Sequence, residues 1–139
     1  MRLPGNKVIE IMDTTLRDGE QTSGVSFSAH EKVSIARQLL SDLGVNRIEI
    51  ASARVSEGEY DAVKLTVRWA ERAGYLSRLE VWGFVDGETS LNWIKSAGCK
   101  VMNLLCKGSF KHVTEQLRKT PEQHIADITE VVNKAQEMG

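Results

Sequence analysis

The chain has 139 residues, which is enough for one compact domain and too few for two of ordinary size. Hydrophobic residues make up 41% and charged residues 27%, which is typical of globular proteins and excludes a disordered, collagen-like or membrane-spanning chain. Lysine and arginine total 18 against 19 acidic residues, a net charge of −1, so we expect no nucleic-acid partner and no membrane partner.

Short apolar runs rich in β-branched residues alternate with segments of helical period. The first run, residues 8–12, predicts a strand that ends at Asp13. Ser28 and Glu31 have the spacing of a capping box, and they predict the start of a helix that ends at Gly44. The predicted apolar face of that helix consists of Val33, Ala36, Leu40 and Leu43.

The same strand–helix pattern repeats three more times. Further strands are predicted over residues 47–50, 79–85 and 101–105. Ser56 and Glu59 form a second capping-box signature before a helix, and a short helix around residues 91–97 follows the third strand. A helical turn near residues 113–117 precedes a last helix that begins at the Thr-Pro-Glu-Gln segment 120–123. The apolar stripes of the two long helices are predicted as Val63, Val67 and Ala70, and then Ile125, Ile128, Val132 and Ala135.

This alternation predicts an α/β protein with right-handed crossovers and a parallel sheet. About four βα units form either a small open doubly wound sheet or the first half of a TIM (β/α)₈ barrel, and periodicity does not separate the two. Polar residues at or after the carboxyl ends of strands mark the face that binds ligands in both architectures. These residues are Asp13, Ser52, Asp86 and Lys107. No glycine-rich nucleotide motif follows the first strand, which disfavours a nucleotide site.

Residues 13–21, Asp-Thr-Thr-Leu-Arg-Asp-Gly-Glu-Gln, gather charged and hydrogen-bonding side chains directly after the first strand. Asp18 is a hard oxygen ligand suited to Mg²⁺, Mn²⁺ or Zn²⁺. Arg17 beside it is a fixed cation whose guanidinium can hold a carboxylate or a developing oxyanion. The alternative for a loop of this composition is a solvated turn whose charges pair with one another.

The order of residues 13–21 resembles the signature that opens the barrel of the 2-isopropylmalate, homocitrate and citramalate synthases. Four further segments are similar to this group, so the resemblance runs nearly from end to end. They are residues 24–27, 47–54, 83–87 and 103–105. Ser23 departs from the proline that many members carry, which affects the stiffness of the loop more than its chemistry.

The resemblance implies an acyltransferase of leucine or isoleucine biosynthesis that condenses acetyl-CoA with a small 2-oxo acid, using a divalent metal ion (Mg²⁺, Mn²⁺ or Zn²⁺). Residues 1–139 would form the N-terminal half of the TIM-barrel catalytic domain, with the remaining metal ligands beyond Gly139. We therefore expect this chain alone to be inactive, and the full-length protein to be a homodimer. The alternatives are a metal-dependent aldolase or lyase of the same barrel superfamily, or a non-catalytic small α/β binding module.

The matching positions carry the family's roles as expectations. Asp18 would bind the metal, and Arg17 would contact the substrate and stabilise the enolate or alkoxide oxygen during catalysis. Glu49, at the end of the second strand, would orient Arg17, although a structural ion pair inside the barrel is an equal alternative. Gln21 would add a polar contact to the substrate near the metal.

Trp82 and Leu105 would form the wall that contacts the side chain of the oxo acid, with ordinary barrel packing as the alternative. Citramalate-type members tend to have leucine at the position of Trp82, and isopropylmalate-type members often have histidine. A tryptophan that points inward leaves little room for an isopropyl group, which favours pyruvate over 2-oxoisovalerate.

The cysteines and histidines give no metal site by their spacing. Cys99 and Cys106 are expected to be reduced, partly buried thiols, and no export signal is visible at the amino terminus, so we expect a cytoplasmic protein. His30, His112 and His124 lack the spacing of a metal-binding pair, and surface or capping roles are expected for all three.

Overall fold

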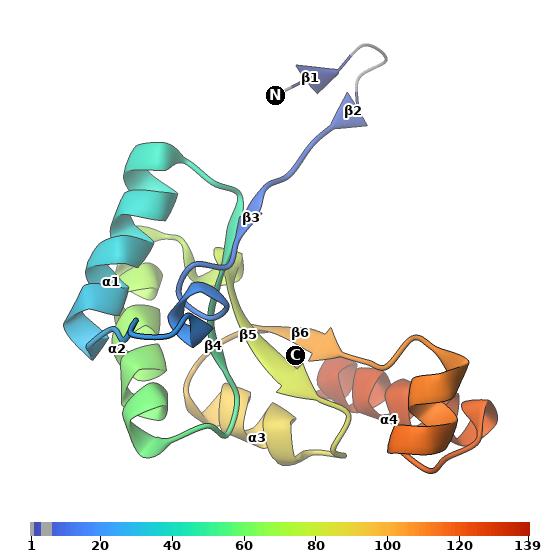
Figure 1. The fold of residues 1–139 in the computed structure, drawn as a ribbon. Coiled ribbons are helices and arrows are strands. Elements are labelled where there is room, and N and C mark those ends of the chain that lie inside the picture. The colour runs from blue at the N-terminus through green and yellow to red at the C-terminus, as the bar shows by residue number, and fades with distance from the viewer. Residues whose placement is uncertain (1, 4–6) are drawn as a thin grey trace.

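The computed structural model describes residues 2–3 and 7–139 and contains a four-stranded parallel sheet (Figure 1). The strands follow one another across the sheet in chain order: β3 (Met12–Asp13), β4 (Arg47–Ser52), β5 (Leu79–Phe84) and β6 (Val101–Leu105). A separate antiparallel pair, β1 (Arg2–Leu3) and β2 (Lys7–Val8), precedes this sheet. The parallel α/β arrangement predicted from the sequence is therefore confirmed.

Four helices connect and flank the strands. They are α1 (Ala29–Arg37), α2 (Glu57–Ala73), α3 (Thr89–Ser96) and α4 (Pro121–Met138). In Figure 1, α1 and α2 lie together on one side of the sheet and α4 lies beside β6. Four short helical segments complete the described chain: η1 (Gly19–Gln21), η2 (Gln38–Leu43), η3 (Leu76–Arg78) and η4 (His112–Gln116). Among the residues that the structure describes, no helix is both long enough and apolar enough to cross a membrane.

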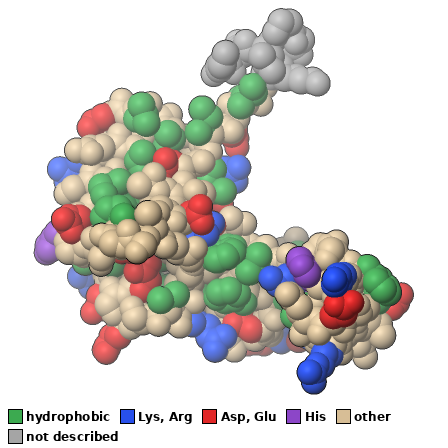
Figure 2. Space-filling view, in the orientation of Figure 1, with side chains coloured by type: hydrophobic (Ala, Val, Ile, Leu, Met, Phe, Trp, Pro, Cys, Tyr) green, Lys and Arg blue, Asp and Glu red, His purple; other side chains and the backbone are tan. Residues whose placement is uncertain are grey.

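The main core lies between the strands and the first three helices. Leu79 and Val81 of β5 are fully buried in it with apolar side chains of α1 and α2. Side chains alternate along a strand, so Trp82 and Phe84 lie on the face of β5 opposite to Leu79 and Val81. Their rings contact each other there, with centroids 5.8 Å apart. Figure 2 shows hydrophobic side chains gathered over β5 and β6. The sheet thus has one face covered by helices and one face that carries polar and aromatic side chains.

Most predicted boundaries and caps are confirmed. Strand β6 has the predicted bounds, and complete capping boxes form at Ser28 with Glu31 and at Thr120 with Gln123. Gly44 ends its helix with φ of 74°, the left-handed conformation that costs glycine least. These local signals are strong because each depends on residues only a few positions apart.

The first strand is shorter than the predicted span of residues 8–12. Only Met12 and Asp13 pair with β4, whereas Val8 pairs with β1 and residues 9–11 belong to no strand. In the described sheet, β3 is an edge strand with β4 as its one neighbour. An edge strand has fewer ladder hydrogen bonds to hold it extended, so the apolar run 8–12 does not become one continuous strand.

Two predicted apolar faces differ from the structure at some positions, although Ala36 and Leu40 are buried as predicted. Leu43 is 72% exposed, because η2 is a π-helical segment whose wider turn rotates its last residue away from the core. In α4, Ile125 and Val132 are exposed, whereas Val131 is buried. The face that α4 buries is therefore rotated by one position from the one predicted for this helix.

His124 is also buried, and the cap of α4 is made by Thr120 and Gln123, so the predicted surface or capping role of His124 is wrong. Its Nε2 atom lies 3.1 Å from the carbonyl oxygen of Lys107, so the ring connects α4 to the loop after β6. His30 and His112 are exposed, as expected. Both cysteines are free thiols, but only Cys99 is buried, and Cys106 is exposed.

Candidate functional site

The loop after β3 turns sharply because its own backbone closes it. The carbonyl oxygen of Thr14 accepts hydrogen bonds from the amides of Arg17, Asp18 and Gly19 at 3.2, 2.7 and 3.2 Å. Asp13 accepts from the amide and the hydroxyl of Thr15 at 2.9 and 3.1 Å. Asp13 therefore shapes the turn, and Arg17 and Asp18 leave it side by side at the carboxyl end of the sheet.

Arg17 is held from three sides. Its Nε donates to Oε2 of Glu49 at 2.5 Å, and its Nη1 donates to Oδ1 of Asp18 at 2.9 Å. Its Cζ lies 4.2 Å from the centre of the Trp82 ring, a stacked cation–π geometry. Nη2 makes no hydrogen bond within the described part of the chain. The guanidinium is therefore fixed in orientation, and its Nη2 group remains available as a donor.

Glu49 lies at the centre of this arrangement and has a side chain that is 0% exposed. Oε2 accepts from Arg17, and Oε1 accepts from Nδ2 of Asn103 on β6 at 2.6 Å. A buried carboxylate is tolerated only when its oxygens are paired, and here both are. Glu49 thus connects the loop after β3 to β4 and β6. Its contact with Arg17 is the one that the sequence led us to expect.

Asn103 is a residue of this site that sequence reasoning missed. It is the one polar side chain of β6, whose sequence is Val-Met-Asn-Leu-Leu. It lies in register with Trp82 across the sheet, on the face that carries Glu49. A single amide in an otherwise apolar strand was the signal available from the sequence.

Asp18 is open to solvent, with 62% of its side chain exposed, and Gln21 on η1 is exposed as well. Among the described residues, no three His, Cys, Asp or Glu side chains are grouped closely enough to hold a metal ion. A hard divalent ion takes about six donors. Asp18 therefore fits as one carboxylate ligand of a metal site, and the described residues do not form a complete one.

An open cleft of about 650 Å³ lies between this loop and the start of α2. Arg17 and Gln21 line one part of it, and Ser52 and Ser56 line another. Its size is within the range of small-molecule sites. Trp82 and Leu105, the predicted wall residues, do not line this cleft. Trp82 lies beneath the Arg17 guanidinium, and Leu105 lies in register with Phe84 at the end of the sheet.

A second polar cluster joins the loops after β4 and β5. Nη1 of Arg54 donates to Oδ2 of Asp86 at 2.6 Å, and the hydroxyl and amide of Ser90 donate to the same carboxylate at 2.8 and 3.0 Å. Burial acts to raise the pKa of Asp86, but these hydrogen bonds and the Arg54 charge outweigh it, so the pKa is lowered. Arg54 has φ of 67°, a strained conformation for a residue with a Cβ, and its bond to Asp86 helps to hold it there.

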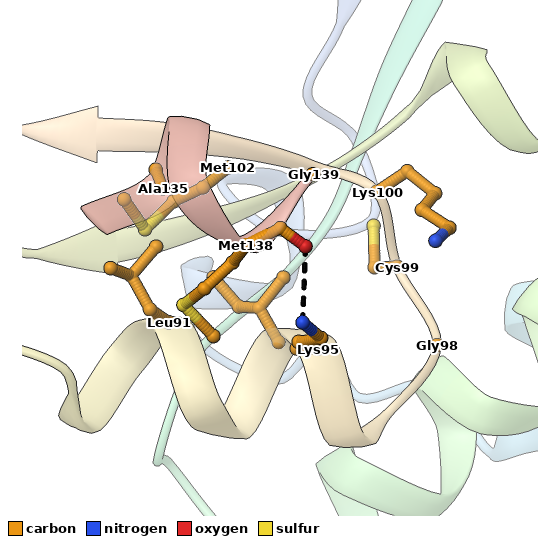
Figure 3. A pocket seen from close by; sticks show the side chains of 10 residues that line it. Leu91, Lys95, Gly98, Cys99, Lys100, Met102, Ala135, Met138 and Gly139 are labelled. Carbon is orange, nitrogen blue, oxygen red and sulfur yellow. Dashed lines mark hydrogen bonds between the residues drawn. The ribbon is translucent and has the colours of Figure 1, made fainter. Parts of the chain in front are cut away.

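A smaller cavity of about 100 Å³ lies at the opposite, amino-terminal end of β6 (Figure 3). It is enclosed by α3, the start of β6 and the end of α4, where Nζ of Lys95 donates to the carbonyl oxygen of Met138 at 3.0 Å. Its lining is mostly apolar and includes Leu91, Ile94 and Met102. This cavity shares no residue with the cleft beside Arg17.

Curated proteins named as synthases are similar to this chain over most of its length. A 2-isopropylmalate synthase from Pyrococcus furiosus is 40% identical over 115 residues, which are 83% of this chain and 23% of that protein. An (R)-citramalate synthase from Methanocaldococcus jannaschii is 36% identical over 134 residues, 95% of this chain and 26% of that protein. The chain therefore spans about a quarter of the length of these two relatives.

A solved structure shows the same fold. It is an HMG-CoA lyase from Acinetobacter baumannii in complex with coenzyme A and 3-methylmalate, with a TM-score of 0.58 and 23% sequence identity. The match covers 94% of this chain and 42% of that one. It confirms the predicted fold class, parallel βα units of a TIM barrel. The family model described as HMGL-like matches residues 8–139, and the chain therefore belongs to the HMGL-like family.

Proposed function

We propose that this chain forms the first half of the catalytic barrel of a synthase that condenses acetyl-CoA with a small 2-oxo acid and then hydrolyses the thioester. The observation that carries the proposal is Arg17, fixed between buried Glu49 and Trp82 beside exposed Asp18. Relatives named 2-isopropylmalate synthase and citramalate synthase support this reaction class.

Arg17 is the group in this chain that meets the developing charge. In the condensation, a base takes a proton from the methyl carbon of acetyl-CoA, and the electron pair left on that carbon forms a bond to the carbonyl carbon of the oxo acid. The carbonyl π pair moves to oxygen, and this alkoxide takes up a proton. Nη2 of Arg17 donates to the oxygen that gains the charge, and it needs little reorganisation because Glu49 and Trp82 already fix the guanidinium.

Asp18 supplies one ligand of a divalent metal ion, Mg²⁺, Mn²⁺ or Zn²⁺. The bound ion supplies Lewis acidity at the carbonyl of the oxo acid. The bond from Nη1 of Arg17 to Oδ1 of Asp18 orients that carboxylate and leaves its second oxygen toward solvent. Gln21, which lines the same cleft as Arg17, adds a polar contact to the substrate.

The oxo acid proposed is pyruvate. Trp82 carries a large ring beneath Arg17, on the face of the sheet that carries Glu49 and Asn103. Trp82 does not line the cleft itself, but its ring lies against the same guanidinium, and a ring of this size would leave less room beside Arg17 for a branched substrate side chain. Leu105, two residues beyond Asn103 on β6, extends the same wall.

The test is the release of free CoA thiol from acetyl-CoA by the protein that carries the complete barrel, with pyruvate and with 2-oxoisovalerate. We expect thiol release that depends on pyruvate and on added divalent metal, and that is lost in Asp18→Asn. Release that is insensitive to metal and unchanged in Asp18→Asn would contradict the role of Asp18. Cleavage of a 3-hydroxyacyl-CoA with no condensation activity would show a lyase instead.

A further inference from the structure

Lys32 lies in α1 close to its start and has a side chain that is only 2% exposed, which is unusual for a lysine. Its Nζ lies 2.6 Å from Oε2 of Glu20 and donates to both carboxylate oxygens of Glu59 at 2.7 and 2.9 Å. It also donates to the carbonyl oxygens of Leu16 at 3.3 Å and Ile50 at 3.5 Å. One buried ammonium thus contacts β4, α2 and the loop between β3 and α1 (residues 14–28), which we call the catalytic loop because the proposed function places Arg17 and Asp18 in it.

The two carbonyl contacts lie directly beside the ion pair of the candidate site. Leu16 is the residue before Arg17, and Ile50 is the residue after Glu49. Lys32 therefore binds the backbone of the loop and of β4 at the same level where Arg17 and Glu49 meet. Two chain segments held at this point have little freedom to slide past each other.

The two carboxylates extend this connection. Oε1 of Glu20 accepts from the amide of Phe27 at 2.9 Å, so Glu20 closes the loop across residues 20–27 while its other oxygen meets Lys32. Ser56 accepts from the amide of Glu59 at 3.1 Å. The reciprocal bond of the predicted capping box is not formed, because the Glu59 carboxylate turns to Lys32 instead. Only one of the two hydrogen bonds of the predicted capping box therefore forms at α2.

We propose that Lys32 is a positioning residue for Arg17: it locks the catalytic loop onto β4 and α2 and thereby fixes the guanidinium above Trp82. The catalytic consequence rests on the proposed function, but the positioning itself does not. The three protons of this buried ammonium are shared among the four oxygens of Glu59, Leu16 and Ile50 and the nearby Oε2 of Glu20, so removing it leaves two carboxylates and two carbonyl groups without their common partner.

Trp82 offers a direct readout of where Arg17 lies, because the guanidinium stacks on its ring. The other two tryptophans, Trp69 and Trp93, contact Tyr75 and Tyr60. Replacing both with phenylalanine keeps an aromatic ring at each place and leaves Trp82 as the one tryptophan among residues 1–139. In this background, Arg17→Lys defines the Trp82 emission expected when the stacked guanidinium is absent.

The test compares Lys32→Met, which removes the ammonium, with Lys32→Arg, which keeps the charge. In Lys32→Met we expect Trp82 emission to shift toward that of Arg17→Lys, and the amide of Phe27 to lose protection from hydrogen exchange. In Lys32→Arg we expect Trp82 emission and Phe27 amide protection to stay close to those of the parent protein. Val131→Ala, a buried α4 residue outside the main core, should lower stability without either change.

A folded Lys32→Met protein with parental Trp82 emission and parental Phe27 protection would overturn the proposal. The same shift of Trp82 emission in Val131→Ala would also overturn the proposal. Should Lys32→Met fail to fold, Glu59→Gln weakens the same connection more gently, and an unchanged Trp82 emission in that variant would overturn the proposal equally. No substrate or metal enters these measurements, so their outcome is independent of the thiol-release test of the proposed function.

Discussion

Nε of Arg17 donates a hydrogen bond to Oε2 of Glu49 at 2.5 Å, and the side chains of the two residues are 14% and 0% exposed. This pair differs from the other ion pair at the same level of the sheet. Glu80 lies in register with Glu49 on the neighbouring strand, but its partner Arg47 is 44% exposed. Removing the carboxylate therefore leaves a shielded cation in one case and a solvated cation in the other.

Glu49→Gln is expected to lower the free energy of unfolding by about 3–5 kcal/mol, the usual cost of removing one partner of a buried ion pair. Both partners of Glu49, Arg17 and Asn103, donate hydrogen bonds, so a glutamine would turn an NH₂ group toward a donor. Urea unfolding measures the change. The matched control is Glu80→Gln, whose carboxylate is also buried but whose partner Arg47 is 44% exposed, so a smaller loss than in Glu49→Gln is expected. Equal losses in the two variants would show that the burial of Arg17 does not determine the cost.

Arg17→Lys is expected to lower kcat by about 10²–10³-fold, the cost of removing one preorganised oxyanion donor. A lysine keeps the charge but lacks the planar fork that contacts Glu49, Asp18 and the Trp82 ring together. KM should change less than kcat, because the lost contact is made mainly in the transition state.

The control for this variant is Arg47→Lys, at the amino end of β4, where the side chain contacts Glu10 and Glu80 away from the cleft. We expect its steady-state kinetics to match the parent. If Arg17→Lys retained kcat within a few-fold of the parent, the oxyanion role would be untenable.

Trp82→Leu is expected to raise the ratio of kcat/KM for 2-oxoisovalerate to kcat/KM for pyruvate by about tenfold or more, the usual scale for added room in an apolar pocket. Removing the ring also removes the platform under Arg17, so kcat for pyruvate should fall. Phe84→Leu, which changes the neighbouring ring of the same face, is the control and should alter the ratio less. A ratio that stays constant in Trp82→Leu would place the ring outside the substrate site.

Asp86 gives a pH-dependent prediction. Its pKa is lowered from the ordinary value of 3.8, so its contribution to stability is present above that value and is lost as the pH falls through the folded pKa. Asp86→Asn should therefore be less stable than the parent at pH 7, by no more than about 1 kcal/mol for a partly exposed pair. The difference should shrink below a pH of about 4. Urea unfolding at both pH values measures it, and a difference that is the same at both would refute the ionic contribution of Asp86.

The sequence predicted features that depend on near neighbours or on one contiguous motif. The capping boxes at Ser28 and Thr120 formed because each needs only four consecutive residues. The Arg17–Glu49 contact could be expected because residues 13–21 matched a family signature and strand β4 had to lie beside β3. Parallel order was set by the alternation of strands and helices.

Features that depend on distant packing were not predictable in the same way. Nothing in the pattern of α1 marks Lys32 as buried, because its partners come from the loop, β4 and α2. The burial of His124 depends on where the loop after β6 places the carbonyl of Lys107. In both cases a polar side chain is buried because tertiary contacts satisfy it, and helical periodicity says nothing about such contacts.

The most direct test of the central claim is the mass of the product formed from pyruvate and acetyl-CoA labelled in both acetyl carbons, using the protein that carries the complete barrel. We predict a branched hydroxy diacid that retains both labelled carbons, formed with one free CoA per product, and its loss in Arg17→Lys and Asp18→Asn. Release of labelled acetate with no new carbon–carbon bond would contradict a condensing role for the site built by Arg17, Asp18 and Glu49.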